Sequence, residues 1–297
     1  MPKTAIALWT LGAFLILGVP ACAQGQAKPA KPQVEGVPVD TQWTLDAAGI
    51  VQRNAIRSVL LLVCPRTAMK GTGFLIAGGK VITAAHVVDG CNAADLEGTT
   101  PLNAAIQFSR IIRDEHRDLA VLVPKVALEG GLQLATDASV PLGKAVTTWG
   151  FPLIYNGPAP LLSVGYVSGY YGAAIEGRTV RHMVLNGAFN PGNSGGPLFV
   201  AGDNKVVGVV VWKRIAFSDQ VQVAIDGFRS PRGVGTSGRF SIRRTDGTIK
   251  GVSDQEVIAA VLEEFYTKVQ VDIGEAVSVS ELRAFLHEHA AELTSTN

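Results

Sequence analysis

Short apolar runs rich in β-branched residues alternate with polar turn residues over most of the chain. The runs occupy residues 58–63, 73–76, 81–83, 105–108, 119–123, 145–149, 163–167, 181–185, 197–200 and 206–212. Their length and composition are typical of β-strands. Gly78-Gly79 and Asp203-Asn204 lie between neighbouring runs, where hairpin turns are needed. The pattern therefore predicts a mostly antiparallel, all-β fold, either a barrel or a sandwich.

Two later segments have a helical pattern instead. The sequence 253–256, Ser-Asp-Gln-Glu, is a capping box, and apolar residues follow it on one helical face as far as about Tyr266. Ser278 and Glu281 repeat this device and predict a C-terminal helix over about 279–293. Between the last strand and the first helix, residues 214–251 are polar and Gly-rich, which indicates an inserted hairpin or flap.

The N-terminus has the organisation of a secretory signal peptide over residues 1–23. Lys3 precedes an apolar run that Pro20 ends, and small residues follow at Ala21 and Ala23. The run is short for a membrane anchor, whereas residues 19–22 resemble a bacterial lipoprotein box, in which Cys22 would carry the lipid. We expect an exported protein, periplasmic or secreted, with membrane attachment only if Cys22 is lipidated. Residues 24–43 read as a Pro-rich linker.

Composition and charge narrow the function classes. The 297 residues are 47% hydrophobic and carry 26 basic against 25 acidic side chains, which is a globular composition close to neutrality. Because basic residues form no stripe with interleaved aromatics, we expect no nucleic-acid binding. Cysteine and histidine lack the spacing of a zinc site, so we expect neither a metal nor a cofactor.

Two cysteines, Cys64 and Cys91, remain after removal of a leader that contains Cys22. In an oxidising compartment they allow a single disulfide. The sequence leaves two alternatives open, one bridge or two buried free thiols, because it does not give the distance between the two Cα atoms.

The candidate chemistry centres on a Gly- and Pro-rich loop, residues 190–198, around Ser194. Such a loop can bend sharply and direct successive backbone N–H groups into one concavity, where they would stabilise an oxyanion beside a serine nucleophile. A plain Gly-rich turn is the alternative. A nucleophilic serine needs a base and an acid that orients the base. His86 ends one apolar strand and Asp118 begins another, and together with Ser194 they form a candidate triad.

The segments around these three residues resemble the active-site segments of chymotrypsin-fold, trypsin-like serine endopeptidases. They read Thr-Ala-Ala-His at 83–86, His-Arg-Asp-Leu-Ala-Val-Leu at 116–122 and Gly-Asn-Ser-Gly-Gly-Pro at 192–197. The Asn before the serine, the Asn-Pro at 190–191 and the Trp-Gly-Phe-Pro turn at 149–152 resemble the bacterial HtrA/DegP-like branch more closely than digestive trypsins. The resemblance covers about residues 45–212 and a last strand and helix from Val269 onward.

This resemblance implies two six-stranded antiparallel β-barrels. The first, over 44–140, would carry His86 and Asp118. The second, over 141–297, would carry Ser194, an insertion with a helix over about 214–268, and the C-terminal helix. That insertion is longer than the family's usual connection, and no PDZ domain is expected behind the protease because most residues after Ser194 are needed to complete the second barrel. Activation by a freed N-terminus is not expected either, since the linker lacks a cleavage-site motif.

The resemblance also implies the roles of the site residues. His86 would act as general base and then general acid, Asp118 would orient it, Ser194 would attack the scissile carbonyl, and the N–H groups of Gly192 and Ser194 would form the oxyanion hole. The implied function is an exported serine endopeptidase that acts on protein or peptide substrates without a cofactor. A catalytically silent, protease-fold peptide-binding or scaffold protein of the cell envelope is the alternative.

Two features of the implied substrate site predict different substrate preferences. Ala188 stands six residues before the serine, where trypsin-like members place an acid, and Phe189 follows it. This pair favours an uncharged pocket for small or aliphatic side chains. Trp212 and Lys213 resemble the strand that pairs with substrate, and Lys213 at the pocket rim would favour acidic side chains.

Overall fold

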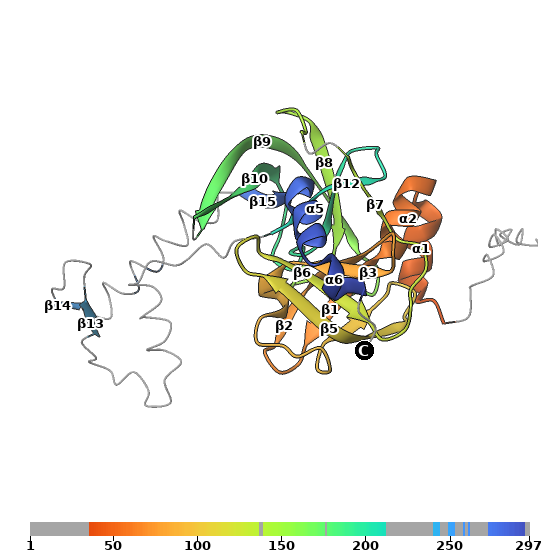
Figure 1. Cartoon of the computed structure of the whole chain (residues 1–297), viewed down its shortest axis with the longest axis horizontal. Helices are drawn as coiled ribbons and strands as arrows, with labels where there is room; N and C mark the ends of the chain where they lie inside the picture. The colour runs from red at the N-terminus through yellow and green to blue at the C-terminus, as the bar shows by residue number, and fades with distance from the viewer. Residues whose placement is uncertain are drawn as a thin grey trace, which may run out of the picture. The chain divides into compact units, whose positions relative to one another are not determined.

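Antiparallel strands form most of the regular secondary structure in the computed structural model (Figure 1). The structure describes residues 36–136, 139–175, 177–211, 240–243, 249–252, 258, 261 and 273–294. All of them fall within one compact unit that spans Val34–Asn297. No helix among these described residues is long and apolar enough to cross a membrane. The signal peptide predicted over 1–23 lies outside them and stays a prediction.

The first barrel closes in the strand order β1-β2-β3-β6-β5-β4. Its strands are β1 (Val59–Cys64), β2 (Met69–Ile76), β3 (Lys80–Thr83), β4 (Glu97–Thr99), β5 (Ala105–Asp114) and β6 (Leu119–Pro124). The β2–β3 turn contains Gly78 and Gly79, both at positive φ, as their position between two apolar runs predicts. Large apolar side chains from several strands, including Phe74, Ile82 and Leu122, are fully buried inside.

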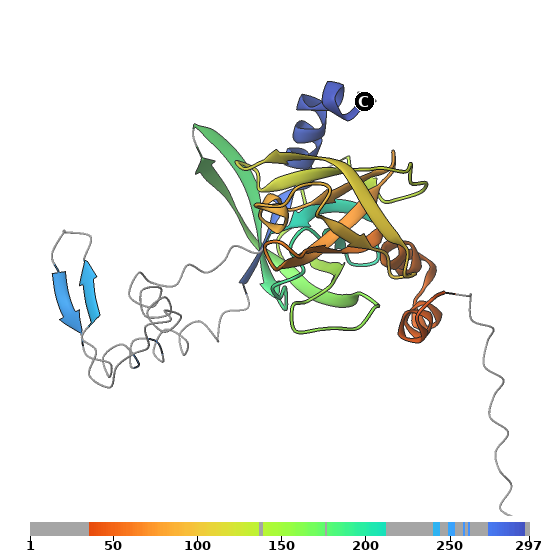
Figure 2. The ribbon, with the colours of Figure 1, turned by 90° about the horizontal axis from the view of Figure 1, so that it is seen from below.

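The second barrel has the strand order β11-β8-β9-β10-β15-β12 and closes through pairing of β11 with β12. Its strands are β8 (Ala145–Gly150), β9 (Leu161–Ile175), β10 (Arg178–Gly187), β11 (Pro197–Val200), β12 (Lys205–Val210) and β15 (Ile273–Ser278). The short β7 (Gln133–Leu134) adds to β12 in parallel. Beyond the barrel wall, β9 and β10 continue as a long hairpin (Figure 2). The prediction of two six-stranded antiparallel barrels is confirmed.

The predicted C-terminal helix begins where its cap signal places it. The Ser278 hydroxyl accepts a hydrogen bond from the Ser280 N–H, and α5 (Val279–Glu288) follows directly on β15. The helix buries Leu282 and Phe285. A break at His289 separates α5 from α6 (Ala290–Thr294), so the predicted single helix is divided in two.

The insertion is described only in part. Two strands, β13 (Phe240–Arg243) and β14 (Ile249–Val252), pair antiparallel within the stretch predicted to hold a hairpin. The helix predicted over 253–266 lies outside the described residues except for Ile258 and Val261, which are helical.

Two N-terminal helices were not expected from the sequence. The first, α1 (Val39–Ala47), begins inside the segment interpreted as a linker, and α2 (Ile50–Ser58) leads directly into β1. The second helix is amphipathic and buries Ala55 and Ile56 in the apolar core that also fills the first barrel. Leu45 of α1 is buried in the same core, so packing also holds the helix whose first turns fall in the segment that composition assigned to a tether.

A disulfide joins Cys64 to Cys91, with their Cα atoms 6.2 Å apart. The bridge, one of two alternatives that the sequence left open, is thus confirmed and the free thiols are excluded. It links the end of β1 to the segment after the short 3₁₀-helix η1 (Ala85–Val88). For a sequence separation of 27, the chain-entropy model gives a stabilisation of about 3.5 kcal/mol.

Candidate active site

His86 and Asp118 meet in the first barrel. β3 ends at Thr83, and η1 then turns the chain so that His86 is about one-third exposed. Asp118 is the last residue of the β5–β6 turn and has a φ of 52°. One carboxylate oxygen, Oδ2, lies 2.8 Å from His86 Nδ1, and the other, Oδ1, accepts the His86 backbone N–H at 3.0 Å. Asp118 therefore fixes both the ring and the backbone of the histidine.

These contacts determine which ring nitrogen of His86 is available for chemistry. An ionised carboxylate only accepts hydrogen bonds, so Nδ1 carries the hydrogen in the pair with Asp118. In the neutral imidazole this leaves Nε2 unprotonated and able to take up a proton. His86 thus has the tautomer that a general base requires.

Ser194 lies in the loop between β10 and β11, and hydrogen bonds within the loop hold its shape. Asn193 N–H donates to the Asn190 carbonyl at 3.0 Å, and Gly196 N–H donates to the Asn193 carbonyl at 2.9 Å. Gly195 N–H donates to the carbonyl of Val210 on the neighbouring strand β12 at 2.7 Å. The loop that carries Ser194 is therefore anchored to the wall of the second barrel.

Two positions of this loop require glycine, because their φ angles are positive and because neighbouring atoms leave no room for a Cβ. Gly192 has a φ of 98° and Gly195 a φ of 83°, which L side chains rarely adopt. A Cβ on Gly192 would lie 2.4 Å from the Phe151 carbonyl oxygen, and one on Gly195 would lie 2.1 Å from the Thr72 carbonyl oxygen. The glycines thus allow the loop to approach backbone from both barrels.

Thr72, on β2, joins the serine loop to the first barrel. Its N–H donates to the Ser194 carbonyl at 2.9 Å, and its hydroxyl donates to the Gly192 carbonyl at 2.7 Å. The Thr83 hydroxyl in turn donates to the Thr72 carbonyl at 2.7 Å. Thr83 lies three residues before His86, so these bonds hold the serine loop beside the strand end that leads to the histidine. Sequence analysis missed Thr72, whose only signal was a hydroxyl between two glycines in an apolar run.

The peptide between Pro191 and Gly192 is oriented by the turn after β8. Leu153 N–H donates to the Pro191 carbonyl at 2.8 Å. Because C=O and N–H point in opposite directions across a trans peptide, the Gly192 N–H points away from Leu153. Lys70 holds the same turn, since its ammonium donates to the carbonyls of Pro152 and Tyr155 at 3.2 and 2.6 Å. Burial lowers the pKa of Lys70 below its usual value.

Asn193, directly before the serine, is fully buried. Its Nδ2 donates to the Ser163 hydroxyl at 3.1 Å. The side chain is neutral, so this position has no buried anion that would need an ammonium as partner.

The predicted substrate-binding residues are described only in part. Ala188 is exposed, and Phe189 is buried with its ring against two strands. A Cβ on Gly165 of β9 would lie 2.5 Å from the Phe189 ring, and one on Gly274 of β15 would lie 2.8 Å from its Cβ. Phe189 thus fills the space that these glycines leave. Trp212 and Lys213 lie outside the described residues, whose nearest member is Val211.

Within the described part of the chain, no three His, Cys, Asp or Glu side chains come together as metal ligands.

Comparisons with known proteins agree with the geometry. Residues 71–209 match the family model of the trypsin-like peptidase domain. Among curated proteins, the chain is 32% identical over 154 residues to the mitochondrial protease Do-like 4 of Arabidopsis thaliana. This match covers 50% of this chain and 29% of the relative. The chain is also 32% identical over 155 residues to the putative serine protease HhoA of Synechocystis, a match that covers 48% of this chain and 37% of the relative. The chain thus spans about a third of the length of these relatives.

A solved structure shares the fold. The active form of the Rv3671c protease of M. tuberculosis has a TM-score of 0.55 and 17% sequence identity, and the match covers 91% of this chain and 96% of that one. The comparison with the solved structure shows that the two proteins share a fold. The match to the family model lies within residues 71–209. Residues 71–209 therefore resemble a trypsin-like peptidase domain, this part of the chain is similar to HtrA/Do-like proteases, and the chain has the two-barrel chymotrypsin-like fold.

Proposed function

We propose that the protein is an exported serine endopeptidase in which His86, Asp118 and Ser194 form the catalytic triad. The observation that carries this proposal is the carboxylate of Asp118, which binds both Nδ1 and the backbone N–H of His86. The similarity to trypsin-like peptidases supports the same assignment. Protein or peptide substrates follow from the reaction, and no cofactor is required.

In the proposed reaction, Ser194 Oγ attacks the carbonyl carbon of the scissile peptide bond while its proton passes to His86 Nε2. Asp118 stabilises the imidazolium that forms. The carbonyl oxygen becomes an oxyanion that receives hydrogen bonds from the N–H groups of Gly192 and Ser194. The imidazolium then gives its proton to the leaving amine, and the acyl-enzyme that remains is hydrolysed by water along the reverse sequence.

Export is supported by two independent features. The N-terminal sequence has the order of a leader peptide, with a cation, an apolar run and small residues. The Cys64–Cys91 bridge is a feature of proteins that fold in an oxidising compartment.

Labelling with a fluorophosphonate tests the proposed nucleophile. We expect the exported wild-type protein to be labelled at Ser194, because the reagent requires an activated serine, and we expect Ser194→Ala to remain unlabelled with an almost unchanged melting temperature. His86→Ala should lose labelling too, because the base is gone. Folded wild-type protein that resists the reagent and cleaves no peptide would contradict the proposal and favour the silent binding protein instead.

We further propose that Phe189 limits the pocket for the side chain before the scissile bond to small or aliphatic residues. The Phe189 ring occupies the space beside Gly165 and Gly274, so Phe189→Ala should open room for a larger side chain. We expect cleavage after large apolar residues to rise by about 10-fold or more relative to cleavage after alanine.

A peptide library cleaved by both proteins measures this preference. Phe199→Ala is the matched control, since it removes a buried phenylalanine from β11 and should lower stability without shifting the preference. A wild-type preference for acidic side chains would contradict the proposal and implicate Lys213 instead.

A further inference from the structure

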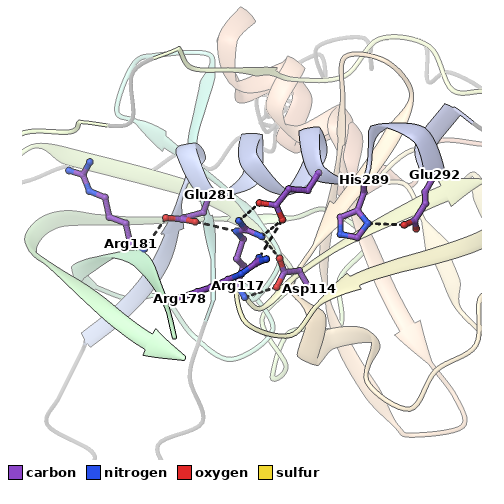
Figure 3. A network of polar contacts seen from close by, with 8 residues as sticks. Asp114, Arg117, Arg178, Arg181, Glu281, His289 and Glu292 are labelled. Carbon is purple, nitrogen blue, oxygen red and sulfur yellow. Dashed lines mark hydrogen bonds and ion pairs between the residues drawn. The ribbon is translucent and has the colours of Figure 1, made fainter. Parts of the chain in front are cut away.

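A buried guanidinium lies beside the proposed triad. Arg117 precedes Asp118 in the chain, and its side chain is only 8% exposed. Its Nη1 donates to Asp114 Oδ2, and its Nε donates to Glu281 Oε2 at 3.2 Å. Glu288 accepts two bonds in a fork, from Nη1 at 2.9 Å and from Nη2 at 2.7 Å. Figure 3 shows Arg117 between Asp114 and the carboxylates of α5. We call these four residues the Arg117 cluster.

The cluster connects the β5–β6 turn to the C-terminal helix. Asp114 ends β5, whereas Glu281 and Glu288 lie 164 and 171 residues beyond Arg117 on α5. Glu281 also accepts the backbone N–H of Arg181 on β10 at 3.1 Å. Since α5 follows directly on β15, the turn that carries Asp118 is attached to the second barrel through these bonds.

Charge makes this attachment strong. One guanidinium faces three carboxylates, and the fork to Glu288 is the geometry in which arginine binds carboxylate best. The hydrogen bond from Arg117 lowers the pKa of Glu288, and Arg178, 3.5 Å from Glu288, acts in the same direction. The bond to Glu288 likewise raises the pKa of Arg117.

The position of Asp118 is what the attachment holds. Asp118 has a φ of 52°, in the left-handed region that L-residues adopt only at a cost. Both carboxylate oxygens of Asp118 bond to His86. The orientation of this carboxylate therefore depends on the backbone of the turn. The adjacent Arg117 restrains that backbone, with its own N–H bonded to Asp114 Oδ1 at 3.1 Å and its side chain held by α5.

We propose that the Arg117 cluster is a positioning device for the triad aspartate, through which the C-terminal helix sets the alignment of Asp118 with His86. The inference rests on the proposed protease function and deepens it. Glu281 and Glu288 act through Arg117 and touch neither substrate nor the reacting atoms. They are positioning residues, and their loss should affect turnover more than substrate binding.

We test the proposal in the full chain with two single variants, Glu281→Gln and Glu288→Gln, and with the double variant that combines them. Each exchange keeps the size of the side chain and removes its charge. We expect the double variant to lose about 10- to 100-fold in kcat on a peptide substrate, the effect of a shift of about 1 Å in catalytic geometry, with KM changed less than about threefold. Glu292→Gln, which alters the carboxylate that pairs with His289 on the same C-terminal segment, should stay within about twofold of wild type.

The split between kcat and KM separates positioning from plain stabilisation. A displaced Asp118 leaves the substrate contacts in place and slows the chemical step, so kcat should fall in the folded double variant at temperatures well below its melting temperature. If the double variant has a lowered melting temperature but wild-type kcat, the proposal is overturned and the cluster only stabilises the fold.

These experiments distinguish failure of the positioning role from failure of the proposed protease function. If wild-type protein takes up no fluorophosphonate, the protease assignment itself fails. If wild type is labelled, and the glutamine variants are labelled and turn over as fast as Glu292→Gln, the protease assignment stands and the positioning role fails. If the double variant does not fold, the single variant Glu288→Gln, whose side chain is 41% exposed, still gives kcat and KM.

Discussion

Asp118→Asn is expected to lower kcat by about 10⁴-fold, the size of this effect in well-characterised Ser-His-Asp proteases. The reason lies in the two contacts of the carboxylate. Since the His86 backbone N–H donates to one oxygen of Asp118, the amide oxygen of an asparagine must occupy that position. Its NH₂ group then faces His86 Nδ1, which has to accept. The hydrogen moves to Nε2, and the histidine can no longer take the proton of Ser194.

Steady-state cleavage of a peptide by wild type and variant measures this effect. Asp203→Asn is the matched control, because that aspartate accepts only local N–H bonds in the β11–β12 turn and should leave kcat unchanged. Near-wild-type turnover by Asp118→Asn, with an unchanged melting temperature, would mean that Asp118 does not set the tautomer of His86.

Gly195→Ala is expected to destabilise the fold by about 2–5 kcal/mol and to abolish fluorophosphonate labelling. A methyl group there would meet the Thr72 carbonyl oxygen at 2.1 Å and the Thr83 hydroxyl at 2.2 Å. Both belong to the first barrel and are held by hydrogen bonds, so the serine loop has to move away. Crowding of this kind costs roughly 1–3 kcal/mol, and the left-handed backbone adds about 1–2 kcal/mol for an L-residue.

Chemical denaturation measures the change in the free energy of unfolding. Gly202→Ala isolates the backbone contribution, because Gly202 has a φ of 86° and a methyl group added there would meet no atom of the surrounding structure within 4 Å. This variant should lose only about 1 kcal/mol and keep full labelling. Equal losses in the two variants would show that the serine loop is not packed against the first barrel.

Local patterns were sufficient to predict most of the barrel strands and the candidate triad, whereas the short β4 (Glu97–Thr99) was missed. β-branched runs marked the barrel strands, and the N-cap at Ser278 marked α5, because each signal is contained in a few adjacent residues. The three short segments around His86, Asp118 and Ser194 likewise identified the site without any knowledge of distance. The trypsin-like fold that they implied is confirmed.

Features that depend on distant partners could not be predicted in this way. Helix α1 has no strong amphipathic pattern, so nothing local marked it. The role of Thr72 depends on the Gly192 carbonyl 120 residues away. The partners of Arg117 on α5 are further still along the chain. Nothing in the residues around Arg117 shows whether its side chain is buried and paired or solvated, although it adjoins the proposed catalytic aspartate.

The order of the strands in the second barrel also has a consequence for biosynthesis. β15, the last strand in the chain, lies between β10 and β12 and pairs with both. Until residues 273–278 have been synthesised, the barrel that carries Ser194 has a gap between those two strands. The carboxylates of α5 are translated later still, so a chain that ends before them lacks the contacts that support the Ser194 loop and the Asp118 turn. Completion of the candidate site thus depends on residues that are translated well after Ser194.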